Sequence, residues 1–363
     1  MTNPTCPADV RHQLLVGTYT AGSSAGIQVF DFDDRAGHIG ERRQEVPCSN
    51  PSWLVLSPSA DLLYAVHEDS EGRVGCFRRD ASGRLEACES QPSEGDHPTH
   101  ASLAADGRHL FVANYAADRE PGVLSVLPVT AEGALLRARH KQIHARGSAI
   151  DPERQAHGHV HCVVSDPSGR YLFACDLGAD EVVVHRYQPD TEPPLQPASY
   201  FEAPPGSGPR HLVFSQDGRF AYLTLELSGE LLALAHAEGV LTPLQRLRLA
   251  PDGFQGKVAA GALHLSADGR FLYAVDRGEH NHLVVYRVDP DAGRLDLLQR
   301  RSCEGQEPRE FALSPSGRFL LVANQGSDCI RLFERDPHDG RIGALLQTVS
   351  VGAPSDFVFV SLP

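Results

Sequence analysis

Ionisable side chains recur at two fixed positions around a turn that is repeated along the chain. Eight residues before the turn the chain carries, in order, Ser52, Thr99, His161, Arg210, Gly261, Arg309 and Ser355. Eight residues after it the chain carries Tyr19, Glu68, Tyr115, Leu177, Glu226, Arg277 and Gln325. Histidine and glutamate side chains can transfer protons, and arginines can bind an anion through paired hydrogen bonds. These residue types together predict acid–base chemistry on a small anionic substrate.

Both positions fall at the ends of expected strands, where polar residues are also common for the plain reason that water reaches them. In an antiparallel hairpin the two positions are neighbours, because the strands run in opposite directions. Their residues come from different repeats and would nevertheless converge at one opening of the fold. Such convergence is how a functional site is built on a symmetric scaffold, so it favours a site over a solvated rim.

One interval between turns is longer than the others, 62 residues against 47 to 51. The additional residues lie in segment 138–161, which is locally basic and leads into the position of His161. The segment is either a tolerated surface insertion or a flap that brings Arg154, Gln155 and His157 over the site.

Three histidines alternate at the end of this segment: His157, His159 and His161. In an extended chain all three would face one side and could bind a metal ion. No acidic or cysteine partner follows at ligand spacing, so acid–base work or hydrogen bonding is the interpretation that we favour. We therefore expect no metal and no organic cofactor.

The repeated turn stands between two short apolar runs. The clearest copies of this phrase begin at Leu56, Leu103, Ser165, Phe214, Leu265 and Leu313. Asp-Gly or Ser-Gly between alternating apolar runs is a strong hairpin signal. A half copy from Leu14 opens the chain, with Arg11 in the turn position, and the matching first run from Pro354 closes it. A period near 48 residues with about four strands per unit is typical of a β-propeller blade.

The sequence therefore predicts an all-β, seven-bladed β-propeller that occupies residues 1–363 as a single domain. The N-terminal strands and a C-terminal strand around Phe357 would share one blade and close the ring, which removes the large free edges of a sheet. An open solenoid of β units is the alternative. Residues 1–12 are expected to form a loose N-terminal arm.

Composition restricts the partners. The formal net charge of −14 argues against nucleic acid and against an anionic membrane surface. No stretch approaches the ~18 apolar residues of a membrane span, and residues 1–12 lack the apolar core of a secretory signal, so we expect a cytoplasmic protein. The eight cysteines form no C-x-x-C pair and are interpreted as reduced, packed thiols. The oligomeric state is left open.

Several motifs together resemble the seven-bladed lactonase family, which includes propeller-type 6-phosphogluconolactonases and fungal carboxy-muconate lactonising enzymes. The resemblance covers essentially the whole chain. It is carried by LLVGTYT…GIQVFDFD from Leu14, ANY from Ala113, PERQ from Pro152, HVH from His159, GSGPRHLVF from Gly206, LEL from Leu225, DRG from Asp276 and PREFALSPSGRFLLVANQ from Pro308. The repeat phrase alone is less specific, because it also resembles YVTN-type propellers, which need not be enzymes.

The resemblance implies which residues act. The family's functional histidine, glutamate and two arginines correspond by motif to His161, Arg210, Glu226 and Arg277, the same four that the two turn-related positions select. The candidates for substrate binding are Arg154, Gln155, His159, Arg309, Glu68 and Tyr115.

The implied activity is hydrolysis of a phosphorylated sugar lactone, 6-phosphogluconolactone to 6-phosphogluconate, a reaction of the pentose phosphate pathway. Either His161 or Glu226 would be the general base, and Arg210 and Arg277 would stabilise the oxyanion. One alternative is a carboxy-muconate lactonising or cyclase-type enzyme that uses the same side chains on a dicarboxylate. Another is a non-catalytic, YVTN-like propeller that binds a small anion or a protein partner.

Overall fold

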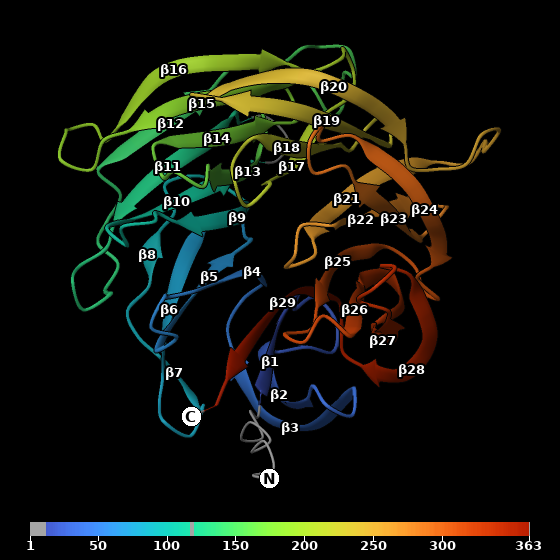
Figure 1. The fold of residues 1–363 in the computed structure, drawn as a ribbon. Coiled ribbons are helices and arrows are strands. Elements are labelled where there is room, and N and C mark those ends of the chain that lie inside the picture. Colours follow the sequence, from blue (N-terminus) through green and yellow to red (C-terminus); the bar gives the residue numbers. More distant parts are fainter. Residues whose placement is uncertain (1–11, 117–119, 363) are drawn as a thin grey trace, which may run out of the picture.

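The structure, a computed structural model, describes residues 12–116 and 120–362. These residues form seven antiparallel sheets that are arranged as blades around a common centre (Figure 1). The prediction of an all-β, seven-bladed propeller is confirmed. Arg11 and the rest of the expected arm lie outside the described residues, apart from His12, which is the first residue of β1.

The blades follow one another along the chain, each from its innermost to its outermost strand except where stated. Blade 1 contains β29 (Pro354–Ser361), β1 (His12–Thr18), β2 (Gly26–Asp33) and β3 (His38–Pro47). Blade 2 contains β4 (Pro51–Leu56), β5 (Leu62–His67), β6 (Arg73–Arg79) and β7 (Leu85–Ala87), and a short β8 (Gln91–Pro92) also pairs with β6. Blade 3 contains β9 (Pro98–Leu103), β10 (His109–Asn114), β11 (Gly122–Pro128) and β12 (His140–His144).

The remaining blades have the same plan. Blade 4 contains β13 (Val160–Ser165), β14 (Tyr171–Asp176), β15 (Glu181–Tyr187) and β16 (Leu195–Glu202). Blade 5 contains β17 (Pro209–Phe214), β18 (Phe220–Leu225), β19 (Glu230–Ala237) and β20 (Val240–Arg248). Blade 6 contains β21 (Val258–Leu265), β22 (Phe271–Gly278), β23 (His282–Val288) and β24 (Leu295–Ser302). Blade 7 contains β25 (Pro308–Leu313), β26 (Phe319–Asn324) and, after the 3₁₀ turn η1 (Gln325–Ser327), β27 (Cys329–Arg335) and β28 (Ile342–Ser350).

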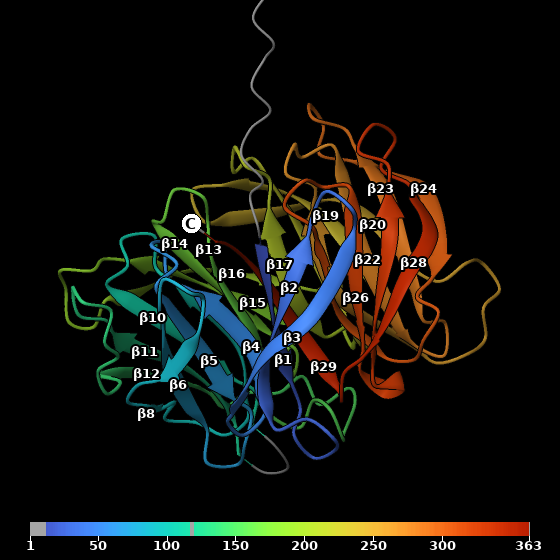
Figure 2. The same ribbon diagram turned by 90° about the horizontal axis from the view of Figure 1, so that it is seen from below.

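Blade 1 joins the two ends of the chain. Strand β29 pairs antiparallel with β1, with Phe359 opposite Leu14 and Phe357 opposite Val16. The two strands lie side by side in both views (Figures 1 and 2). The predicted closure is therefore confirmed, and the strand that completes the blade comes from the opposite end of the sequence.

The repeated turns adopt the left-handed backbone conformation that the sequence pattern requires. Their glycines have φ between 68° and 72°, and these are Gly107, Gly169, Gly218, Gly269 and Gly317. In one of these turns the Gly269 amide donates to the Ser266 carbonyl oxygen over 2.8 Å. Glycine reaches this conformation without the clash of a Cβ, whereas Ala60, with φ 59°, adopts it in blade 2 despite one.

A register shift interrupts the innermost strand pair of every blade at the same place. In blade 4, Val160 pairs with Asp176 and Cys162 with Cys175, so His161 between them has no direct partner. The residues that fall in the seven shifts include Ser52, Thr99, His161, Arg210, Gly261, Arg309 and Ser355. A bulge re-aims a side chain, and these are the residues that stand eight places before the turn.

Apolar side chains pack between neighbouring blades and hold the ring together. Phe173 of blade 4 and Leu223 of blade 5, for example, belong to one buried cluster. The seven described cysteines are free, and Cys6 lies outside the described residues. No helix among the described residues is long and apolar enough to span a membrane.

The segment 138–161 is only partly the loop that its length suggests. Residues 140–144 form β12, the outermost strand of blade 3, and residues 145–159 form the connection to blade 4. The strand was hidden in the sequence because only one side of an outermost strand packs against the blade. We refer to residues 145–159 as the flap.

Candidate active site

Glu226 follows β18 directly, and three guanidinium groups surround its carboxylate. Arg210 Nε donates to Oε2 over 2.9 Å, and Arg277 Nη2 lies 3.1 Å from the same oxygen. Arg154 Nη2 donates to Oε1 over 2.8 Å. The arginines come from β17, β22 and the flap, so three separate segments meet at one carboxylate. We call these four residues the Glu226 cluster.

The Glu226 cluster is almost completely removed from water. The residue exposure is 1% for Arg210 and 5% for Glu226. Burial by itself favours the protonated carboxyl, but the positive charges of Arg277 and Arg210 outweigh it and hold the pKa of Glu226 well below its usual range. Glu226 is therefore an ionised counter-charge, and a carboxylate of such low proton affinity is a poor general base.

His161 lies beside this cluster on β13. Its imidazole packs edge-on against His211, with ring centroids 5.1 Å apart, and against Tyr115 at 5.8 Å. Burial, followed by the charge of Arg210, lowers the pKa of His161 well below its usual value, so the ring is neutral at pH 7. Its Nδ1 is buried without a hydrogen-bond partner among the described residues. A neutral imidazole with an unused nitrogen is available to accept a proton.

Two buried N–H groups of the arginines are also unused. Arg210 Nη1 and Arg277 Nε have no hydrogen-bond partner among the described residues. Buried polar groups are rarely left unpaired, because each costs about 1–3 kcal/mol. Gly261 gives Arg277 its room, since a Cβ there would lie 2.6 Å from Val275 Cγ2 and 3.4 Å from Arg277 Cγ. The unused donors are well suited to an oxyanion.

A second carboxylate-centred group lies on blades 1, 2 and 7. The hydroxyls of Tyr19 and Ser52 donate to Glu68 Oε2 over 2.7 and 2.5 Å. Arg309 Nη2 lies 3.5 Å from the same oxygen, and its guanidinium carbon lies 4.9 Å from the centre of the Tyr19 ring. We call these four residues the Glu68 cluster.

Arg309 links the two clusters electrostatically. Glu68 and Glu226 both raise its pKa against the opposing effect of burial, which is the largest influence. The four guanidinium groups of the clusters face two carboxylates, so two positive charges are not compensated there. An excess of positive charge in a protein of net charge −14 makes the two clusters the place where a small anion binds.

The flap is fastened to blade 4 by Gln155. This side chain is fully buried, and its Nε2 donates to Asp180 Oδ1 over 2.8 Å and to the Leu177 carbonyl oxygen over 3.0 Å. Asp180 also accepts the amides of Gly206 and Gly208. Gln155 was predicted to bind substrate, but its amide is engaged inside the protein. It is a positioning residue that places the neighbouring Arg154.

Replacement of Gln155 by alanine is expected to lower kcat/KM about tenfold, because Arg154 loses its support and spends less time at Glu226. If Gln155 acts through Arg154, the double variant Arg154→Ala/Gln155→Ala will be no slower than Arg154→Ala alone. Steady-state rates of the two single variants and the double variant measure this coupling. Independent, multiplying losses would contradict the assigned role.

The two remaining histidines of the flap differ in their contacts. His159 stacks on Tyr115, with ring centroids 4.5 Å apart and 16° between the planes, and its Nδ1–H donates to the Tyr115 carbonyl oxygen over 2.8 Å. The His157 side chain makes no hydrogen bond within the described residues. No three His, Cys, Asp or Glu side chains in residues 12–116 and 120–362 are arranged to hold a metal ion.

Three residues of the site were not among the sequence candidates. Tyr19 and Ser52 stood at the two turn-related positions, and this was the signal that could have identified them. Asp180 carried no such signal, because it meets Gln155 only through the folded path of the flap.

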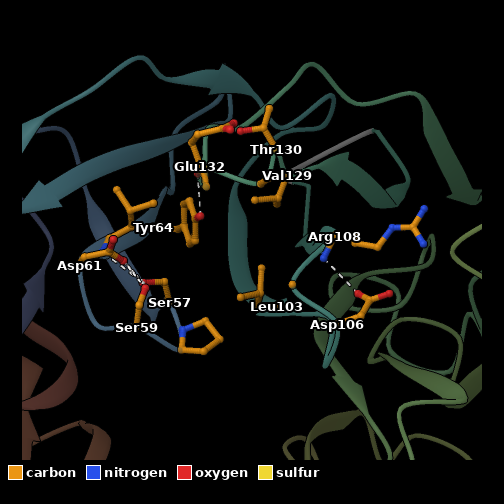
Figure 3. Close-up of a pocket in the computed structure, with 15 residues that line it drawn as sticks. Ser57, Ser59, Asp61, Tyr64, Leu103, Asp106, Arg108, Val129, Thr130 and Glu132 are labelled. Carbon is orange, nitrogen blue, oxygen red and sulfur yellow. Dashed lines mark hydrogen bonds between the residues drawn. The ribbon is translucent and has the colours of Figure 1, made fainter.

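A cavity of about 600 Å³ opens elsewhere, at the turn ends of blades 2 and 3 (Figure 3). It is lined by residues of the repeated turns, such as Asp61 and Arg108, and by the loop 129–133. The Asp61 carboxylate accepts a hydrogen bond from the Ser57 hydroxyl over 3.0 Å. None of the predicted site residues lines this cavity, since they stand at the opposite ends of the strands.

Comparison with known proteins agrees with the fold and the site. The family model described as "Lactonase, 7-bladed beta-propeller" matches residues 13–359. A 6-phosphogluconolactonase of Bacillus subtilis is 32% identical over 343 residues, which are 93% of this chain and 95% of that protein. A 6-phosphogluconolactonase of Formosa agariphila is 34% identical and covers 94% of this chain and 98% of its own length.

Among solved structures, the periplasmic gluconolactonase PpgL of Pseudomonas aeruginosa superimposes with a TM-score of 0.95. It is 53% identical and covers 97% of this chain and 100% of its own. The resemblance drawn from the sequence motifs is thereby confirmed. The match spans the whole ring of blades that assembles the two clusters, and the chain belongs to the seven-bladed β-propeller family of lactonases, which are lactone hydrolases.

Proposed function

We propose that this protein hydrolyses a sugar lactone and that its substrate is 6-phosphogluconolactone, which it converts to 6-phosphogluconate. The observation that carries the proposal is the pairing of a neutral, unpartnered imidazole, His161, with a surplus of guanidinium groups around Glu226. A base and a preorganised positive field are the two requirements of lactone hydrolysis.

His161 is the proposed general base. It takes a proton from a water molecule whose oxygen attacks the lactone carbonyl carbon, and a tetrahedral intermediate forms. The C–O bond of the ring then breaks, the ring oxygen receives a proton, and the hydroxy acid is released. Glu226 was an equal candidate for the base, but the guanidinium groups of Arg277 and Arg210 keep its pKa low.

The arginines of the Glu226 cluster are proposed to stabilise the oxyanion. The unused Nη1 of Arg210 and Nε of Arg277 would donate to the oxygen that becomes negative when water attacks. Removal of one such donor typically costs ~10²–10³-fold in kcat, because the donors act where water is excluded. In this scheme Glu226 keeps both guanidinium groups in place.

Arg309 is proposed to bind the phosphate. Its Nη2 approaches Glu68, but its Nε and Nη1 make no hydrogen bond within the described residues. Two adjacent N–H groups of a guanidinium match the oxygens of a phosphate in a bidentate arrangement. Arg154 contributes further positive charge from the flap.

A second candidate substrate is the unphosphorylated gluconolactone. The observation in its favour is the 53% identity to a structure named gluconolactonase. Because that structure is also named periplasmic, the cytoplasmic location expected from the sequence stays a prediction. The two candidate substrates differ only in the phosphate, so the same residues would hydrolyse the ring of either.

Initial rates on 6-phosphogluconolactone and on gluconolactone at pH 7, measured by proton release, test the proposal. We expect both to exceed spontaneous hydrolysis, with the higher kcat/KM for the phosphorylated lactone. Arg309→Gln should lower kcat/KM for that substrate about 10–100-fold, as expected for loss of a charge-assisted hydrogen bond, with little effect on gluconolactone. Arg246→Gln, which changes a surface pair with Glu230, is the matched control.

Each alternative has its own outcome. Equal loss on both lactones in Arg309→Gln, or a preference for gluconolactone in the wild type, would remove the phosphate from the proposal and leave the sugar lactone. Turnover of a carboxylated muconolactone instead would support the lactonising enzyme. No rate above spontaneous hydrolysis on any of these substrates would leave the binding propeller.

A further inference from the structure

The hydroxyl of Tyr115 has a hydrogen that the protein does not use. Tyr115 follows β10 directly, and Arg154 donates to its hydroxyl oxygen from Nη2 over 3.0 Å and from Nε over 3.4 Å. No acceptor for the hydroxyl hydrogen exists among the described residues. Because the oxygen already accepts from a cation, the hydrogen must point away from Arg154, and it is free to meet a substrate.

Contacts on both sides hold the Tyr115 ring in place beside the proposed base. His159 stacks on one face at 4.5 Å, and the edge-to-face contact with His161 is at 5.8 Å. The same guanidinium that contacts the Tyr115 hydroxyl also contacts Glu226. The hydroxyl therefore lies in the Glu226 cluster, in the place where the lactone would react.

We propose that Tyr115 is a catalytic residue that donates its hydroxyl proton to the ring oxygen as the lactone opens. The inference rests on the lactone hydrolysis proposed above. As the tetrahedral intermediate collapses, the bond between carbonyl carbon and ring oxygen breaks, and that oxygen takes the proton of Tyr115. The proton that His161 removed from water then passes to the Tyr115 phenolate. Both side chains return to their starting states, and one water has been added to one lactone.

The neighbouring groups are less suited to this step. Glu226 is ionised and has no proton to give. The Tyr19 hydroxyl already donates to Glu68 over 2.7 Å, so its proton is engaged. Burial raises the pKa of Tyr115, while the charge of Arg154 acts in the opposite direction and would stabilise the transient phenolate. An alkoxide leaving group is more basic than a phenolate, so the transfer is downhill.

The test compares two leaving atoms. Tyr115→Phe is assayed on gluconolactone and on its thiolactone analogue, in which sulfur replaces the ring oxygen, because a thiolate leaves without a proton. We expect kcat to fall about 100-fold on the oxygen lactone and less than about threefold on the thiolactone. Tyr187→Phe removes a hydroxyl that donates to Asp106, outside both clusters, and serves as the control.

A second variant keeps the test decisive if Tyr115→Phe folds poorly. Arg154→Met removes the cation beside the phenolate and should show the same selective loss on the oxygen lactone. An equal loss on both substrates, or no loss on either, would overturn the role of Tyr115. A wild type that hydrolyses neither substrate above the spontaneous rate would refute the proposed function itself, so the two failures are distinguishable.

Discussion

Replacement of His161 by asparagine is expected to lower kcat for lactone hydrolysis by about 10²–10⁴-fold, the usual loss when a general base is removed. The reason is specific to this site. The imidazole is neutral and has an unused nitrogen, whereas Glu226 beside it is held ionised by arginines. Proton release measured in a pH-stat, with spontaneous hydrolysis subtracted, gives the rate. His109→Asn, which changes a histidine bonded to Tyr187 at the turn end of blade 3, is the matched control.

The same base sets the pH dependence. A base works only while it is unprotonated, and the pKa of His161 is lowered well below its usual value of 6.5. The rate should therefore stay level as the pH falls through 6.5 and decline only in more acidic solution. Added imidazole should restore part of the rate of His161→Asn and leave the wild type unchanged. An acid limb centred at 6.5 or above, or a variant that keeps the wild-type rate, would contradict this role.

Replacement of Glu226 by glutamine should have the largest effect on stability, because three guanidinium groups lose the one carboxylate that they share. Removal of one partner from a buried ion pair costs about 3–5 kcal/mol of the free energy of unfolding. Urea unfolding at pH 7 measures the difference from the wild type. Glu230→Gln breaks a more exposed pair with Arg246 in the same blade and should cost only about 0–1 kcal/mol.

Acid should narrow the difference between Glu226→Gln and the wild type. The pKa of Glu226 is lower in the folded protein than its value of 4.5 in an unperturbed chain. The stabilisation is therefore complete above about pH 4.5 and is lost as the pH falls through the lowered folded pKa. A difference that stays constant from pH 7 to strongly acidic solution would mean that Glu226 is not the counter-charge of the cluster. Activity of the variant is also expected to fall, since the guanidinium groups would no longer be held in place.

Much of the fold could be read from one repeated phrase. Gly269 and its equivalents occur between two apolar runs, and a hairpin turn is a local structure that nearby residues decide. The period then determined the number of blades, and the matching half repeats at the two ends determined how the ring closes. β12 was not predicted, because an outermost strand packs on one side only and leaves a weak apolar pattern.

The site could be predicted by position but not by role. The sequence placed His161, Arg210, Glu226 and Arg277 at equivalent points of different blades, because a repeat brings its equivalent positions to the same end of the fold. Two roles were not visible there. The base could not be chosen between His161 and Glu226, and Gln155 looked like a substrate ligand although it is buried against Asp180.

The sequence by itself determined the seven-bladed ring and the set of polar residues that gathers at one end of it. Only the tertiary structure decided which arginines share Glu226, that His161 keeps an unused nitrogen, and that the Tyr115 hydroxyl has a free hydrogen. The physical reason is that turns and periodicity depend on residues close in the chain. Charge pairing and proton affinity depend instead on distances of a few ångströms between side chains from different blades, and these distances exist only after the ring has closed.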